Sequence, residues 1–357
     1  YGDWLGLDKE EGADRSGATD KYLAANAFYA ASASIVSQAA LILGKKEDAE
    51  YYGQLRGTVE DAFRREYITA TGRLVSETQT ACVLVLHFGL AGEEHRGRIM
   101  EALVKNIAAH KEHLSTGFMG TPYLCHVLSE NGQHELAGRI FRQEDYPSWL
   151  YSVKMGATTI WERWNSILPD GSFDESGMNS LNHYAYGSIE EWMYRKLAGI
   201  NQLEPGFRRI QIKPMPVKGI TRAKASLKSA YGMLECAWIC ENGKFTVDLR
   251  IPVNTRAEVY LPEEDEMLEL GSGSYHYVYD TTLDLTADRF STESTLGQIL
   301  QEPAAVEMLE GLAPGMLDNP MIGFAKNMSI GELSGQMPPE GKALFEAVIA
   351  MLNENEG

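Results

Sequence analysis

Basic side chains are scarce in this sequence, and long apolar runs are absent from it. Its 357 residues carry 32 Lys and Arg against 50 Asp and Glu, which gives a formal net charge of −18. Binding to nucleic-acid phosphates needs clustered positive charge, so the composition argues against a nucleic-acid partner. No apolar run approaches the roughly 18 residues of a membrane-spanning helix, so we expect no membrane partner. An acidic surface suits a neutral carbohydrate ligand.

Cysteine is scarce too, and no metal-binding pattern is present. The four cysteines are Cys82, Cys125, Cys236 and Cys240. The last two would lie about 13 Å apart on one strand, beyond disulfide reach. We therefore expect free thiols, a reducing compartment and a cytoplasmic location. No pair of histidines has the spacing of a metal site with supporting carboxylates, so we expect no catalytic metal and no cofactor.

A carboxylate stands between two tryptophans in the segment Gly156–Asn165, which reads GATTIWERWN. Trp161 and Trp164 offer flat apolar faces for a pyranose ring, and burial there can raise the pKa of Glu162. Arg163 would keep this carboxylate ionised if the two pair. The alternative is an amphipathic patch, in which the tryptophans anchor a core and the Glu–Arg pair contributes little.

The segment Gly177–Gly187, which reads GMNSLNHYAYG, favours the sugar site over that alternative. It is dense in side chains that both donate and accept hydrogen bonds, as binding to sugar hydroxyls requires. His183 lies in this segment, and we favour a ligand contact for it. Core or surface roles are expected for His87, His110, His113 and His126, which fall on predicted helices.

These two segments and the opening Tyr1-Gly2-Asp3-Trp4-Leu5 resemble the bacterial α-L-rhamnosidases of the inverting (α/α)6-barrel type. The similarity runs from residue 1 to about residue 285, with the three motifs in the same order. It implies that Glu162 is the general base. It also implies a sugar pocket and its wall, formed by Asp3, Trp4, Trp149, Trp161, Trp164 and His183, and places Thr116, Gly117 and Phe118 near the rim. A plain helix-capping turn explains these last three equally well.

The general acid of such enzymes belongs to a motif N-terminal to the Tyr-Gly-Asp-Trp segment, so we expect this chain to lack it. Glu10, Glu11 and Asp14 are candidate substitutes, but they read as a solvated polar loop without an apolar environment to raise a pKa. An inverting glycosidase needs two carboxyl groups about 6.5–9.5 Å apart, and Glu162 is one of them.

Hydrophobic periodicity predicts a mainly α chain with an all-β domain. Residues 1–202 are expected to form the C-terminal part of an (α/α)6 catalytic barrel of about seven helices. Residues 203–286 alternate with period 2 and predict a small antiparallel β-sandwich, with a type I′ turn at Asn242-Gly243. Residues 287–357 predict a small helical tail module, for which we expect an interaction or oligomerisation role. The predicted helices of the first region are 20–43, 46–67, 78–88, 93–113, 121–130, 133–142 and 188–197. Asp20 can cap the first of them and Gly44 can end it, and the helix 78–88 is apolar on all sides and so expected to be buried.

The sequence therefore predicts a glycoside hydrolase that releases terminal α-L-rhamnose by inversion, with a rhamnose-containing oligosaccharide or glycoside as its partner. Two alternatives stay open. One is a non-catalytic carbohydrate-binding or assembly fragment, and the other is a different inverting α/α-barrel exoglycosidase. Because a partial barrel would expose apolar surface, we also expect a covering partner, either the missing N-terminal half of the barrel or a second chain.

Overall fold

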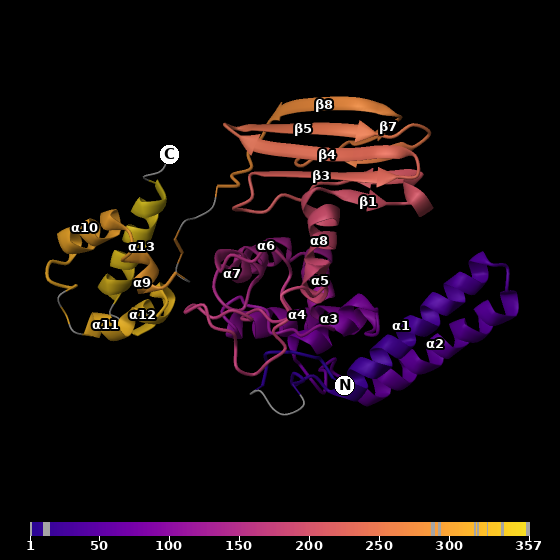
Figure 1. Cartoon of the computed structure of the whole chain (residues 1–357), viewed down its shortest axis with the longest axis horizontal. Coiled ribbons are helices and arrows are strands. Elements are labelled where there is room, and N and C mark those ends of the chain that lie inside the picture. The colour runs from indigo at the N-terminus through magenta and orange to yellow at the C-terminus, as the bar shows by residue number, and fades with distance from the viewer. Residues whose placement is uncertain are drawn as a thin grey trace. The chain divides into compact units, whose positions relative to one another are not determined.

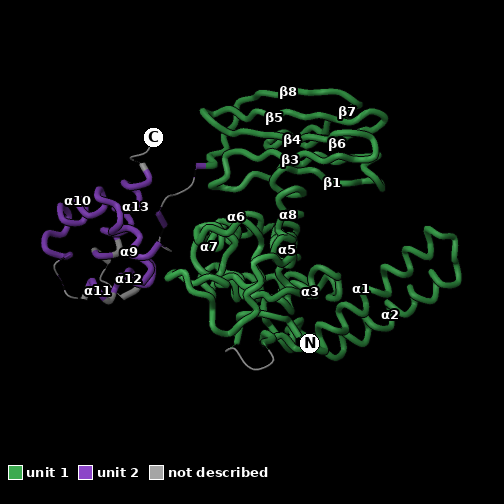
Figure 2. The backbone as a smooth tube through the Cα atoms, viewed as in Figure 1, with its two compact units in different colours: residues 1–285 green, residues 286–357 purple. Residues whose placement is uncertain are grey.

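The computed structural model of the chain describes residues 2–9, 15–286, 290–291, 294–317, 319, 321–326, 328–336 and 339–354. It contains two compact units, Tyr1–Leu285 and Thr286–Gly357 (Figure 2). The first unit holds a helical region followed by paired β-sheets, and the second holds short helices.

A long helical hairpin opens the first unit. Helix α1 (Lys21–Ile42) and helix α2 (Lys46–Tyr67) run side by side and extend from the other helices of the unit (Figure 1). The carboxylate of Asp20 accepts hydrogen bonds from the backbone N–H groups of Tyr22 and Leu23, at 2.9 and 2.7 Å, which confirms the predicted cap. Gly44 takes a positive φ of 72° and ends the first helix.

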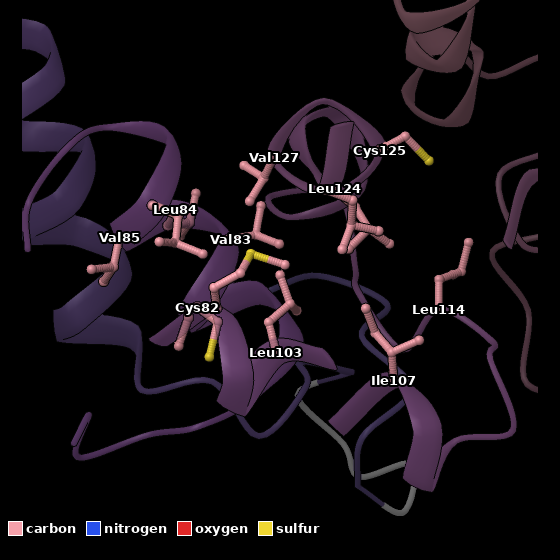
Figure 3. Packing of buried hydrophobic residues seen from close by; sticks show 14 of the residues in the cluster. Cys82, Val83, Leu84, Val85, Leu103, Ile107, Leu114, Leu124, Cys125 and Val127 are labelled. Atoms are coloured by element: carbon pink, nitrogen blue, oxygen red, sulfur yellow. The ribbon is translucent and has the colours of Figure 1, made fainter. Parts of the chain in front are cut away.

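The core of the helical region surrounds α3 (Gln79–His87). Every residue of α3 from Gln79 to Leu86 is buried, as its all-round apolar character predicts. Around it pack α4 (Glu93–Ala109), α5 (Thr121–Glu130) and α6 (His134–Arg142). Figure 3 shows residues of this core, with Leu103 and Ile107 from α4 and Leu124 and Val127 from α5.

The later helices of this region differ from the prediction in three places. Helix α4 ends at Ala109 rather than residue 113, because Lys111 and Glu112 adopt left-handed φ values of 55° and 56°. The short helix α7 (Trp149–Lys154) was not predicted; its hydrogen-bonding cap is Ser148. The single helix expected over 188–197 is instead a 3₁₀ turn (Ala185–Ser188), helix α8 (Ile189–Trp192) and a π-helical turn (Met193–Leu197).

Helix α1 is the one described helix that is long and apolar enough to cross a membrane by length and composition alone, with a window of mean hydropathy 1.2 of which 22% is buried. Alanine and serine interrupt its strongly apolar residues, so the sequence shows no run of purely apolar side chains there.

Two four-stranded sheets follow and share one hydrophobic core. The first has the order β1-β2-β6-β7, and the second β3-β4-β5-β8. Strand bounds are β1 Ile200–Gln202, β2 Arg209–Ile212, β3 Arg222–Ser229, β4 Gly232–Glu241, β5 Lys244–Ile251, β6 Arg256–Tyr260, β7 Met267–Leu270 and β8 Gly273–Asp280. Strands β1, β7 and β8 were not predicted. The expectation of a wholly antiparallel sandwich was wrong in one pairing, because β2 and β6 run parallel.

The Asn242-Gly243 turn confirms the predicted hairpin. Both residues have positive φ, 52° and 67°, as a type I′ turn requires. Glu241 pairs with Lys244, so β4 and β5 take the expected register. Cys236 and Cys240 both lie on β4, and all four cysteines are buried free thiols, as predicted.

The helical and β regions of the first unit are joined by specific contacts. The Trp238 indole donates a 2.7 Å hydrogen bond to the carbonyl of Leu197, and a ring nitrogen of His134 bonds the carbonyl of Met215 at 2.8 Å. Gly138 of α6 faces Val217 so closely that an added Cβ would lie 2.8 Å from it. The β region is therefore packed on α6 and on the last turn of the helical region.

The second unit has its own core and the short helices that the sequence predicts. They are α9 (Leu296–Ile299), α10 (Pro303–Leu312), α11 (Met321–Ala325), α12 (Ile330–Gln336) and α13 (Pro339–Glu354). Leu296, Ile330 and Phe345 are completely buried among them. Thr295 forms a capping box with Gln298 at the start of α9.

Candidate functional site

The two polar and aromatic segments are bonded to each other through their backbones. Glu162 donates its N–H to the carbonyl of Ser180 at 2.9 Å, and His183 donates its N–H to the carbonyl of Ile160 at 2.8 Å. The Thr159 hydroxyl also donates to the carbonyl of Leu181. Segments that lie about 20 residues apart thus bring Glu162 and His183 into one site.

The Glu162 carboxyl group is half-buried and accepts a 3.3 Å hydrogen bond from the Ser180 N–H. A partly exposed carboxylate held by the neighbouring segment can reach a ligand or a water molecule. The Nε of the neighbouring Arg163 lies 3.4 Å from Oδ1 of Asn165. The amide of Asn165 donates in turn to Asp174 at 2.9 Å.

The tryptophans of the site are buried and packed against other rings. Trp164 stacks on Tyr186 with ring centroids 3.7 Å apart and meets the Trp149 ring edge-on at 5.2 Å. The Trp149 indole donates to the carbonyl of Tyr186 at 2.9 Å. Trp161 is also buried. Because all three tryptophans are buried, their rings leave little free surface for a sugar.

Phe118 connects the rim loop to this site. Its ring centroid lies 5.0 Å from that of His183 and 5.3 Å from that of Tyr186. The N–H of Phe118 donates to the carbonyl of Trp4 at 2.9 Å, which places the half-buried Trp4 on the neighbouring loop. Gly117 is required between them, because a Cβ there would lie 2.3 Å from the Trp4 carbonyl oxygen.

Asp3 lies beneath this loop contact with no exposed surface. Its carboxylate accepts hydrogen bonds from the Thr80 hydroxyl at 2.6 Å and from the N–H groups of Gly117 at 2.8 Å and Met119 at 3.1 Å. Burial raises the pKa of Asp3 to about 6, although the three hydrogen bonds oppose this. In this structure Asp3 supports the loops that carry Trp4 and Phe118 and does not itself face solvent.

Sequence reasoning did not single out Tyr186 or the network below Asp3. The Tyr186 ring contacts Trp164 and Phe118, and burial raises the pKa of its hydroxyl far above the ordinary value. The aromatic spacing in Tyr184-Ala185-Tyr186 was a signal, but it does not reveal which ring turns inward. The candidate acids Glu10, Glu11 and Asp14 lie outside the described residues. Among the described residues, no cluster of three His, Cys, Asp or Glu side chains could hold a metal ion.

Helical hairpins packed on two β-sheets, with a half-buried carboxylate in the same region as buried aromatic rings, are consistent with a six-hairpin glycosidase fold. Two family models match the chain: the bacterial alpha-L-rhamnosidase 6 hairpin glycosidase domain over residues 1–197, and the bacterial alpha-L-rhamnosidase C-terminal domain over residues 199–275. The chain therefore belongs to the bacterial α-L-rhamnosidase six-hairpin glycosidase family, and the resemblance seen in the sequence is confirmed.

Relatives and solved structures agree with this assignment. The chain is 38% identical over 295 residues to an α-L-rhamnosidase of Streptomyces avermitilis, covering 78% of this chain and 28% of that protein. It is 40% identical over 267 residues to an α-L-rhamnosidase of Formosa agariphila, covering 74% of this chain and 29% of that protein. The structure of a native α-L-rhamnosidase from Aspergillus terreus matches with a TM-score of 0.73 and 36% identity, covering 78% and 32%. That of the Streptomyces avermitilis enzyme complexed with L-rhamnose matches with a TM-score of 0.71 and 38% identity, covering 78% and 28%. The chain thus spans about three tenths of the length of these proteins.

Proposed function

We propose that this chain is part of a glycoside hydrolase that releases terminal α-L-rhamnose with inversion at the anomeric carbon. The observation that carries the proposal is the half-buried Glu162 carboxylate, held beside His183 by hydrogen bonds between two segments of a rhamnosidase domain. The relatives at 38% and 40% identity are named α-L-rhamnosidases, which supports the choice of sugar.

In the proposed mechanism Glu162 removes a proton from a water molecule, which attacks the anomeric carbon from the face opposite the leaving group. A carboxylic acid protonates the departing glycosidic oxygen from the other side. We assign this acid to a segment N-terminal to Tyr1 in the protein from which the chain comes. His183 and Trp4 are then placed to contact the sugar, while Asp3, Trp149 and Trp164 hold their loops, and Trp161 supports Glu162 from the adjacent position.

The test uses the complete protein and an aryl α-L-rhamnoside, with the anomer of the released sugar followed by NMR. We expect β-L-rhamnose to appear first. Glu162→Gln keeps the shape of the side chain and removes the base, so we expect kcat to fall by about 10²–10⁴ with little change in Tm. Glu144→Gln, at an exposed carboxylate paired with Lys154, is the matched control and should leave kcat unchanged.

Each alternative gives a different result in the same assay. Full turnover by Glu162→Gln contradicts the role of this residue, and α-L-rhamnose as the first product contradicts inversion. Hydrolysis of another glycoside but not of the rhamnoside favours a different exoglycosidase of the same fold. Inactivity of the complete protein on a broad panel of aryl glycosides favours the non-catalytic binding function.

A further inference from the structure

Arg15 lies beside the opening motif and is bonded to it through the backbone. Trp4 and Ser16 form an isolated antiparallel bridge, and the N–H of Leu5 donates to the Arg15 carbonyl at 2.9 Å. The position of Arg15 is therefore coupled to that of Trp4, which is one of the two residues proposed to contact the sugar.

The side chain of Arg15 reaches the segment that carries the other of these residues. Its Nη2 atom donates a 2.6 Å hydrogen bond to the carbonyl oxygen of Ser176, which directly precedes the segment of His183. Gly177 follows with a left-handed φ of 78°, and a Cβ at that position would lie 3.8 Å from the same Nη2 atom. The guanidinium group thus lies against the backbone at the start of this segment.

The turn that contains Ser176 is itself bonded to both polar and aromatic segments. The Asp174 carboxylate accepts 2.9 Å hydrogen bonds from the Asn165 side-chain amide and from the Ser176 N–H. The side-chain amide of Asn179 donates to the Asp174 carbonyl at 2.5 Å. Asn165 ends the first segment and Asn179 belongs to the second, so the turn connects the two. The bond from Arg15 adds the opening motif to this connection.

The backbone of Arg15 takes a conformation that is unfavourable for its residue type. Its φ is 49°, in the left-handed region, where the Cβ of an L-residue crowds the following carbonyl oxygen. Such a conformation persists only where the surrounding structure fixes it, and it is common at ligand sites. Here the hydrogen bonds with Leu5 and Ser176 hold the residue at its backbone and at its side chain.

We propose that Arg15 is a positioning residue for sugar binding, and that its bond to the Ser176 carbonyl sets the spacing between Trp4 and His183. The inference rests on the proposed function, because that function assigns these two residues to the sugar. The planar guanidinium group donates in a fixed geometry, so it holds the two loops in one arrangement. Without it the loops sample other spacings, and only the fraction with the correct spacing binds the sugar.

Glu162 is held by a different set of hydrogen bonds. Its N–H donates to the Ser180 carbonyl, and its carboxylate accepts from the Ser180 N–H. Neither bond involves Arg15, so the orientation of the proposed base does not depend directly on the guanidinium group. Loss of Arg15 should therefore weaken sugar binding and raise KM, while kcat stays close to that of the wild type.

The first test measures the Kd of the complete protein for L-rhamnose by calorimetry, and KM and kcat on an aryl α-L-rhamnoside. Arg15→Asn removes the guanidinium group, and asparagine tolerates the left-handed backbone better than most residues. We expect Kd and KM to rise about tenfold or more and kcat to change less than about twofold. Arg15→Lys can still donate to the Ser176 carbonyl, so it should recover most of the lost affinity.

Arg98→Gln is the matched control for this comparison. Like Arg15, Arg98 donates to a backbone carbonyl of a loop, that of Thr71, at 2.9 Å, but it lies on α4 and outside the proposed site. Its loss should leave Kd, KM and kcat unchanged.

A second measurement needs neither sugar nor activity. Hydrogen exchange of the unliganded protein should be faster in Arg15→Asn than in wild type, both in residues 4–7 and in residues 177–183, and Arg98→Gln should match the wild type there. Faster exchange in only one of these segments, or in neither, overturns the proposal.

The outcomes for Arg15 and for the hydrolase proposal are distinct. A complete protein that binds L-rhamnose without hydrolysing the rhamnoside contradicts the hydrolase proposal, while the Kd of Arg15→Asn still decides the role of Arg15. Unchanged Kd and KM in Arg15→Asn, or a fall in kcat at constant KM, overturns the positioning role and leaves the hydrolase intact. A wild-type protein that binds no L-rhamnose contradicts both.

Discussion

Asp3 holds its carboxyl group out of water at the junction of two loops. Three donors from Thr80, Gly117 and Met119 surround it, and these donors come from segments about 80 and 115 residues further along the chain. The Tyr-Gly-Asp-Trp motif alone cannot indicate this environment, since burial depends on which distant segments pack above the motif. The motif marks Asp3 as a pocket residue, and the structure places it fully buried below the loops that carry Trp4 and Phe118.

The raised pKa of Asp3 predicts a pH dependence of stability. Because the folded state holds the proton with a pKa of about 6, against an ordinary 3.8, protonation of Asp3 stabilises the fold. This contribution is fully present below about pH 4 and is lost as the pH rises through 6. The free energy of unfolding should therefore fall by about 2 kcal/mol between pH 4 and pH 7. The Asn side chain of Asp3→Asn cannot titrate. When urea unfolding is measured across this pH range, the free energy of unfolding of the variant should not show this decrease.

Asp170→Asn serves as the control for this measurement. Hydrogen bonds from Ser172 keep the pKa of Asp170 below its ordinary 3.8, so this group titrates at lower pH than the window tested. The profile of Asp170→Asn between pH 4 and 7 should follow the wild type. If the Asp3→Asn profile does the same, the Asp3 carboxyl group does not titrate near pH 6.

Tyr186 and Trp164 illustrate why side-chain contacts were harder to predict than site membership. The sequence places both residues in the two motifs, and the structure brings these motifs together. Which ring stacks on which depends on rotamers fixed by Phe118 and Trp149, which come from other parts of the chain. Residue type and spacing cannot supply that choice.

At the level of elements, the predictable features were those with local causes. The Asp20 cap, the Gly44 stop and the Asn242-Gly243 turn follow from nearby side chains and backbone angles, and all three occur. The parallel pairing of β2 with β6 joins strands more than 40 residues apart, and no local pattern specifies it. The π-helical turn at Met193–Leu197 likewise sits where the helix meets the β region, at the Trp238–Leu197 hydrogen bond.

The contact between α6 and the β region predicts opposite effects for two helical glycines. A Cβ at Gly138 would lie within 2.9 Å of three Val217 atoms, so Gly138→Ala should lower the free energy of unfolding by about 1–3 kcal/mol. Gly97 of α4 has no atom within 4 Å of the same position, so Gly97→Ala should raise it by about 0.5–1 kcal/mol. Chemical denaturation of both variants measures the two effects, and equal shifts would show that α6 is not packed tightly on Val217.

At the scale of the whole molecule, α1 carries an exposed apolar stripe that another surface could bury. Tyr22, Tyr29, Val36 and Leu43 recur every seventh residue and are all exposed, with Ala25, Ser32 and Ala39 between them. This 3.5-residue period is the spacing by which one helix packs along another. Ile35, Leu41 and Ile42 widen the apolar surface, and Ile42 is 85% exposed. Such a continuous patch on a long helix is typical of an interface.

We therefore expect the isolated 357-residue chain to associate through α1. In a pure sample, the α1 stripe of a second copy is the apolar surface against which the first can be buried. Light scattering after gel filtration should show a mass that rises with concentration above that of one 39.6 kDa chain. Val36→Gln combined with Leu43→Gln, which interrupts the stripe at two of its sevenfold positions, should shift the mass toward one chain. Val253→Gln, at an exposed apolar residue of the β region, should not. Since burial of the stripe is the driving force, a compact monomer of the unmodified chain at every concentration would mean that α1 needs no partner and that the exposed stripe is tolerated in water.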